Sequence, residues 1–239
     1  MTGVVQTKAP PVSPLGLMGL GLAIVAFPIF KVQVVEHLPA IVRYSETGRG
    51  SGWYVWAACY IGAEAVIAAL CLASILRERR RPADAGLNVP ASRVWWLVLA
   101  VFLIAGAIVI ALRHVDVITI MGAPGEDYGA VAARNTAQRI VAVLTSAIVV
   151  PMEEFIWRGF AITRLQRLGL PTWAAVVVPS LAFGYFHGGT IDTIWITGFI
   201  AAAVAVLGVM YLRTRSLAWP ILIHFSWNVM ILSLTPTPV

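Results

Sequence analysis

The chain has 239 residues, of which 59% are hydrophobic and 12% are charged, and its formal net charge is +6. A soluble globular domain carries about 25% charged residues, so this composition, with its apolar residues gathered in long runs, excludes an ordinary soluble protein. The basic balance does not indicate a nucleic-acid partner either, because the arginines cluster at the ends of apolar runs, which is the pattern of membrane topology.

Seven apolar segments follow one another along the chain, and a transmembrane helix needs about 20 such residues. The segments cover about residues 15–30, 53–76, 94–112, 140–162, 172–186, 194–212 and 217–234. The predicted fold is therefore all-α, a polytopic transmembrane bundle of about seven helices. We expect residues 1–93 to form a tail and two helices, and residues 94–239 to form a second unit. The first segment lacks a convincing cleavage site and is expected to stay as an anchor.

The loops between these segments alternate in charge. Basic loops contain Arg77, Arg79, Arg80, Arg81 and Arg93, then Arg164 and Arg167, then Arg213 and Arg215. The loops between them contain Asp116, Glu126 and Asp127, and then Asp192. Because basic loops stay in the cytoplasm, this pattern predicts a cell-membrane protein with a cytoplasmic N-terminus and an external C-terminus.

Three of the apolar segments contain polar or ionisable side chains, which are costly inside a bilayer and therefore mark candidate functional sites. They are Glu153, Glu154, Arg158, His187, His224 and Asn228. Glu154 and Arg158 are spaced so that they share a helix face and form a pair. Glu153 points about 100° away from that face, which leaves it without a partner on its own helix.

Helix lengths predict which of these side chains converge. Glu153 and His187 lie at equal distances along the chain from the turn near residue 170, so an antiparallel pair of helices places them at similar depth. His224 and Asn228 share a face of the last helix. His224 follows Ser216 closely, so its helix must begin deeper in the membrane to match. We expect Glu153, His187, His224 and Asn228 to face one cavity.

The same residues carry a family resemblance. The patterns E-E-x-x-x-R at 153–158, F-x-x-x-H at 183–187 and H-x-x-x-N at 224–228 occur in that order. They are similar to the three motifs of the CPBP family, the CAAX-prenyl-protease and bacteriocin-processing proteins, which include lysostaphin-resistance-like members. The resemblance spans about residues 97–234 and implies an intramembrane endopeptidase that acts on membrane-associated proteins or peptides. It also implies a supporting role for Phe183.

Peptide hydrolysis requires a base for water and donors for the oxyanion. We interpret Glu153 as the general base, acting on water together with His187, and His224 and Asn228 as the oxyanion donors. Glu154 and Arg158 then hold the helix that carries Glu153. No cofactor is required by this interpretation.

Other functions stay open at this stage. In a zinc-dependent version, Glu153, His187 and His224 are the metal ligands, because two histidines and one glutamate make a catalytic zinc site; no obvious base then remains. The family label of metalloprotease agrees with this alternative. Some family members resemble scaffolds or bacteriocin-immunity proteins instead. A transporter with a Glu and His proton relay is a further alternative. Glu64, in the second segment, is interpreted as a helix clamp, with a role in a proton relay as the alternative.

Overall fold

The computed structural model describes residues 11–47, 51–88, 135–188 and 194–234. Over these ranges every regular element is helical and there is no strand, so the predicted all-α class is confirmed. The elements are α1 (Pro14–Gly21), the π-helical η1 (Leu22–Ala26), α2 (Phe27–Gln33), the 3₁₀ turn η2 (Val35–His37), α3 (Pro39–Thr47), α4 (Gly52–Arg77), the 3₁₀ turn η3 (Pro82–Ala85), α7 (Thr136–Glu154), the π-helical η4 (Phe155–Ile162), α8 (Thr163–Arg167), α9 (Thr172–Gly188), α10 (Ile194–Thr214) and α11 (Ala218–Leu234).

The helices have the lengths that a bilayer requires. Pro14–Gln33, Gly52–Arg77, Thr136–Arg167 and Thr197–Thr214 are long and apolar enough to cross a membrane. α9 and α11 have 17 residues each and are strongly apolar, which gives them a length of roughly 25 Å. Six of the seven predicted segments are thus helices, and the seventh, 94–112, lies outside the described residues. The chain is a multi-pass membrane protein.

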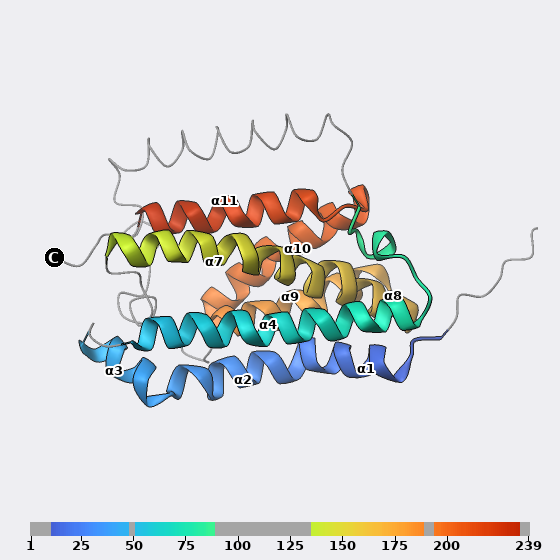
Figure 1. Cartoon of the computed structure of the whole chain (residues 1–239). Coiled ribbons are helices and arrows are strands. Elements are labelled where there is room, and N and C mark those ends of the chain that lie inside the picture. Colours follow the sequence, from blue (N-terminus) through green and yellow to red (C-terminus); the bar gives the residue numbers. More distant parts are fainter. Residues whose placement is uncertain (1–10, 48–50, 89–134, 189–193, 235–239) are drawn as a thin grey trace, which may run out of the picture.

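The long helices run side by side (Figure 1). The α1–α2 stretch lies along α4, α4 lies along α7, and α7 lies along α11, while α9 and α10 pack together across the bundle. The first two helices therefore contact the later ones directly, although a long stretch of sequence separates them. This arrangement places residues of α2 and α4 beside the motif-bearing ends of α7 and α9.

The two faces of α7 differ in the way that a membrane helix should. Ile140, Leu144 and Ile148 lie on one stripe and are 57%, 59% and 53% exposed, as expected of side chains that meet lipid rather than water. Glu153 and Glu154 end the helix and are almost fully buried. The carboxylates of α7 therefore face the interior of the bundle.

A change of helix type follows these glutamates at once. Pro151 lies inside α7 and has no N–H to donate to the preceding turn. From Phe155 the chain continues as the π-helix η4, all of whose residues are buried. π-helical turns of this kind are frequent at functional sites. The prediction of one regular helix over 140–162 missed this change.

Two glycines allow other segments to approach the site closely. A Cβ on Gly159 of η4 would collide with the carbonyl oxygen of Ala85 in η3. A Cβ on Gly184 of α9 would collide with the carbonyl oxygen of Thr197 in α10. Both contacts hold elements that carry motif residues against their neighbours.

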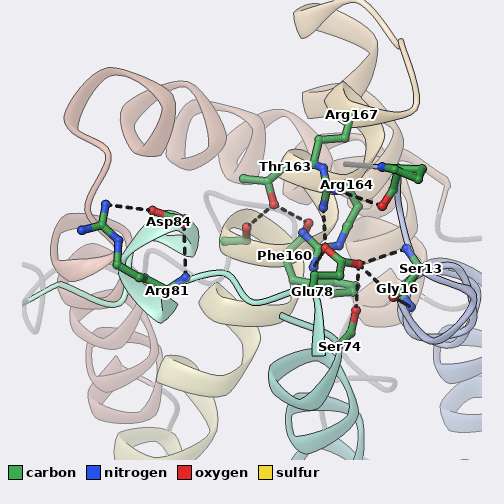
Figure 2. Close-up of polar contacts among 12 residues, drawn as sticks. Ser13, Gly16, Ser74, Glu78, Arg81, Asp84, Phe160, Thr163, Arg164 and Arg167 are labelled. Atoms are coloured by element: carbon green, nitrogen blue, oxygen red, sulfur yellow. Dashed lines mark hydrogen bonds and ion pairs between the residues drawn. The ribbon is translucent and has the colours of Figure 1, made fainter. Parts of the chain in front are cut away.

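At the arginine-rich end of the bundle, the Glu78 carboxylate joins three parts of the chain (Figure 2). Its Oε1 accepts hydrogen bonds from the backbone N–H of Ser13 at 3.1 Å and from the hydroxyl at 2.9 Å. Its Oε2 lies 3.0 Å from Nη2 of Arg164 and 2.5 Å from Nη1 of Arg167. Burial raises the pKa of Glu78, but the hydrogen bonds from Arg167 and Ser13 and the charge of Arg164 lower it by more, so the pKa lies below its usual value. Glu78, at the end of α4, thereby connects the start of α1 to α8.

Candidate active site

The end of α7 buries two adjacent carboxylates. Glu153 is 1% exposed and Glu154 is 0% exposed. Buried charges are tolerated only when they are paired or hydrogen-bonded, so the partners of these two groups define the site. Each glutamate has a different set of partners.

Glu154 forms the ion pair that its spacing predicts. Its Oε1 lies 3.0 Å from Nη1 of Arg158, and both side chains are almost fully buried. The Arg158 guanidinium lies over the Phe183 ring at 4.8 Å, a cation–π contact that strengthens when it is desolvated. Phe183 of the second motif therefore supports Arg158 of the first.

His224 lies between the two glutamates. Its Nδ1 is 2.8 Å from Oε1 of Glu154, and its Nε2 is 3.5 Å from Oε2 of Glu153. A carboxylate only accepts hydrogen bonds, so Nδ1–H donates to Glu154 and the tautomer is fixed. His224 is 7% exposed, and α11 is thus connected to both carboxylates of α7.

Glu153 receives its shortest hydrogen bond from the N-terminal half of the chain. The hydroxyl of Tyr60 in α4 donates to Oε1 of Glu153 at 2.5 Å. The Tyr60 ring stacks on Trp56 and on Phe186, with centroid separations of 5.2 Å and 5.6 Å. The position of the hydroxyl is therefore set by two aromatic neighbours.

His187 reaches the same cluster through aromatic rings. Its Nδ1 lies 3.0 Å from the carbonyl oxygen of Phe183, which can only accept, so Nδ1 carries the hydrogen and Nε2 keeps a lone pair. The imidazole stacks on the Phe183 ring at 4.3 Å, and that ring also meets His224 edge-on at 5.7 Å. Lys31, His224 and Arg158 act on His187 electrostatically.

Asn228 lies one helical turn beyond His224 on α11 and is half-buried. Its spacing from His224 keeps both side chains on one face. The structure thus brings Glu153, Glu154, Arg158, Phe183, His187 and His224 into one connected cluster, with Asn228 next to it along α11.

Three polar residues of this region come from helices that the motif analysis did not include. The sequence analysis did not select Tyr60, it ended the first segment one residue before Lys31, and it interpreted Glu64 as a helix clamp. Lys31 is 8% exposed; its ammonium donates to the carbonyl oxygen of Phe186 at 2.6 Å and lies 4.9 Å from the centre of that ring. A lysine inside an apolar segment is itself a signal of function.

Comparison with known proteins shows one similarity. Residues 135–230 match the family model of type II CAAX prenyl endopeptidases, described as Rce1-like. These residues contain all three motifs. The resemblance to the CPBP family is confirmed, although the match begins at residue 135 rather than near 97. No curated protein and no solved structure matches the chain.

The residues matched by the family model include the three motifs but not every residue of the cluster. Glu153, Glu154, Arg158, His187, His224 and Asn228 lie inside the matched residues, whereas Lys31, Tyr60 and Glu64 lie outside them. The match supports protease activity within a membrane in general terms. The match does not assign a role to any single residue, so the roles proposed below are argued from the contacts described above.

The zinc alternative requires Glu153, His187 and His224 to bind one metal ion. Among the described residues, no group of three or more His, Cys, Asp or Glu side chains is arranged to hold a metal ion. His224 gives its Nδ1 hydrogen to Glu154, and His187 turns its own Nδ1 to a backbone carbonyl. Both contacts leave Nε2 as the remaining ring nitrogen, which suits a water molecule as well as a metal ion. Glu153, His187 and His224 are the residues that would hold a zinc ion, and we derive no step through a metal.

Proposed function

We propose that the chain is an intramembrane endopeptidase that cleaves membrane-associated proteins or peptides with a water activated by Glu153. The observation that carries this proposal is the buried Glu153 carboxylate, whose Oε1 is held by Tyr60 and whose Oε2 faces His224. A carboxylate fixed at one oxygen keeps the other oxygen available for a water molecule. Ordinary packing gives no reason to bury such a group next to a histidine.

In the proposed reaction, Glu153 takes one proton from water, while the lone pair on Nε2 of His187 accepts a hydrogen bond from the hydrogen that stays on the water oxygen. The oxygen attacks the carbonyl carbon of the scissile peptide, and the carbonyl oxygen becomes an oxyanion. Glu153 then returns its proton to the peptide nitrogen as the C–N bond breaks, which leaves a carboxylic acid and an amine. A positioned base of this kind contributes about 10²–10⁴ in rate.

The oxyanion is stabilised by donors on α11 in this proposal. Asn228 offers its amide N–H groups, and His224 offers Nε2–H. The contact of His224 Nδ1 with Glu154 holds the imidazole so that Nε2 is turned toward Glu153. Donors placed in advance where an oxyanion forms are worth more than donors that must first reorient.

We also propose the setting of the reaction. The alternation of basic and non-basic loops supports a cytoplasmic N-terminus, an external C-terminus and a location in the cell membrane. We propose that residues 1–93 and residues 94–239 form the two parts of the chain. The first part is more than an anchor in this view, because α2 and α4 bring Lys31 and Tyr60 to the site.

A peptide assay tests the proposal directly. The substrate is an internally quenched fluorescent peptide that ends in a farnesylated CAAX sequence, presented to purified protein in liposomes beside the same peptide without the prenyl group. Glu153→Gln should lower kcat about 10²–10⁴-fold, with the variant still inserted and folded. Asp84→Asn, a partly exposed carboxylate paired with Arg81, is the matched control and should keep the full rate.

The outcomes separate the candidate functions. Cleavage of both peptides points to a membrane endopeptidase that does not need a prenyl group, and cleavage of the farnesylated peptide alone points to a CAAX protease. Equal rates for Glu153→Gln and the parent chain would reject Glu153 as the base. A chain that cleaves neither peptide and whose cellular role survives Glu153→Ala is a scaffold.

A further inference from the structure

Tyr60 and Glu64 are spaced four residues apart in α4, so they share one face of that helix. α4 packs along α7, and the Tyr60 hydroxyl contacts Glu153 directly. Glu64 therefore lies one turn from a residue that already holds the proposed base. The same face of α4 presents both side chains to the end of α7.

Glu64 is 0% exposed and lies next to Glu153 and Tyr60, with Lys31 close enough to act on its charge. Within the described part of the chain, neither Glu64 oxygen has a hydrogen-bond partner of good geometry. Orphaned buried polar atoms are rare and usually have a functional reason. Here the nearest polar groups are those of the proposed active site.

The contact between Glu64 and Glu153 indicates the form in which Glu64 is present. The two carboxyl groups lie close enough for a side-chain hydrogen bond. Two ionised carboxylates can only accept, so such a bond requires one of them to carry a hydrogen. Glu153 accepts a hydrogen bond from Tyr60, whereas neither Glu64 oxygen has an acceptor or donor assigned to it within the described residues, so Glu64 is the carboxyl that can supply the hydrogen.

We propose that Tyr60 and Glu64 are positioning residues that fix the Glu153 carboxylate from α4 by donating hydrogen bonds to it. The inference rests on the proposed function of Glu153 and adds two residues that lie outside the matched family domain. With α4 holding one side of the carboxylate, Oε2 stays turned toward His224 and the water site.

Conservative variants test this inference in the farnesylated-peptide assay. Tyr60→Phe keeps the ring between Trp56 and Phe186 but removes the hydroxyl. Because a hydrogen bond to a charged group is involved, kcat should fall about 10- to 100-fold, with KM changed by less than about twofold. Glu64→Leu should lower kcat on the same scale, and Glu64→Gln, which still donates, should stay within about threefold of the parent.

A double-variant cycle distinguishes positioning from general damage. In Glu153→Asp the carboxylate is one methylene further back and no longer reaches the Tyr60 hydroxyl. Adding Tyr60→Phe to Glu153→Asp should then cost less than about twofold, whereas a merely structural effect would lower the rate by the same factor in both backgrounds. Thermal unfolding in detergent, measured for each variant, reports on folding separately.

Each result supports or overturns the inference. If Tyr60→Phe and Glu64→Leu keep the parental kcat while Glu153→Gln abolishes it, the positioning role is wrong and the proposed function stands. If Glu153→Gln keeps its activity, the proposed function fails first. If Glu64→Leu does not fold, Tyr60→Phe alone and in the cycle still decides the question.

Discussion

Nδ1 of His224 lies 2.8 Å from Oε1 of Glu154, the same oxygen that lies 3.0 Å from Arg158. This single carboxylate oxygen therefore joins the first motif to the third across the α7–α11 contact. Its neighbour Glu153 has the other nitrogen of the same imidazole at 3.5 Å. One histidine thus couples the structural glutamate to the proposed base, and the two glutamates should respond differently to substitution.

Replacing Glu154 by glutamine should mainly destabilise the protein. The change leaves Arg158 buried beside an uncharged partner, and removing one member of a buried pair costs about 3–5 kcal/mol. Thermal unfolding of the purified variant in detergent measures the loss. The double variant Glu154→Gln with Arg158→Met removes both charges and should recover part of the stability; an unchanged unfolding temperature in the single variant would contradict the pairing.

Asn228→Ala should reduce turnover without weakening substrate binding. Loss of one oxyanion donor lowers kcat by about 10²–10³-fold, and KM should change little because the oxyanion exists only in the transition state. Steady-state kinetics with the fluorescent peptide measures both constants. Trp227→Leu is the control on the same helix, since Trp227 is 42% exposed. A rise in KM at constant kcat would assign Asn228 to substrate binding instead.

Removal of metal should leave the activity in place. If Glu153 acts on water directly, protein stripped with a strong chelator keeps its rate and contains no stoichiometric zinc by elemental analysis. In the alternative, activity disappears with the metal and returns when zinc is restored. Activity that follows bound zinc one to one would make Glu153 a ligand beside His187 and His224.

Acidification should loosen the arginine-rich end of the bundle. The pKa of Glu78 in the folded protein lies below its unfolded value because Arg167, Ser13 and Arg164 outweigh its burial. The stabilisation is therefore complete above the unfolded pKa of about 4.3 and is lost as the pH falls through the folded pKa. Unfolding temperatures of the parent chain should drop over that window, and Glu78→Gln should be less stable at neutral pH and less sensitive to acid.

Cysteine labelling tests the orientation in the membrane. In a chain whose Cys59 and Cys71 are replaced by alanine, Ala83→Cys lies at an exposed position beside the arginine run. It should resist a membrane-impermeant thiol reagent in intact cells and react after lysis. A cysteine at Gly125 should be labelled from outside. The reverse pattern would invert the proposed topology.

Local spacing was sufficient for some features of the site. The Glu154–Arg158 pair follows from a separation of four residues on one helix and needs no knowledge of the fold. The apolar segments likewise required only length and composition. Features that depend on packing between distant segments could not be predicted in this way, and the hydroxyl of Tyr60 on Glu153 is the clearest example.

The depth of His224 shows the same limit. Counting from Ser216 places it only roughly 10 Å into its helix, too shallow to meet Glu153, yet it contacts both glutamates. The reason is that the preceding connection is itself buried: Leu217 is 1% exposed and its N–H donates to the carbonyl of Gly86 at 3.2 Å. α11 therefore begins inside the bundle.

The π-helix η4 between Glu154 and Thr163 has a consequence for insertions and deletions. A π-helical turn holds one residue more than an α-helical turn, so η4 contains a residue that a regular helix would not need. Deleting one residue there would allow an uninterrupted α-helix that still keeps Arg164 and Arg167 in register with Glu153. Inserting a residue, or losing the π-helical turn at constant length, would instead rotate the two arginines by about 100° relative to Glu153. The carboxylates at one end and the Glu78 contacts at the other could not then both form. Insertions among relatives should therefore avoid 155–162 and collect in the loops.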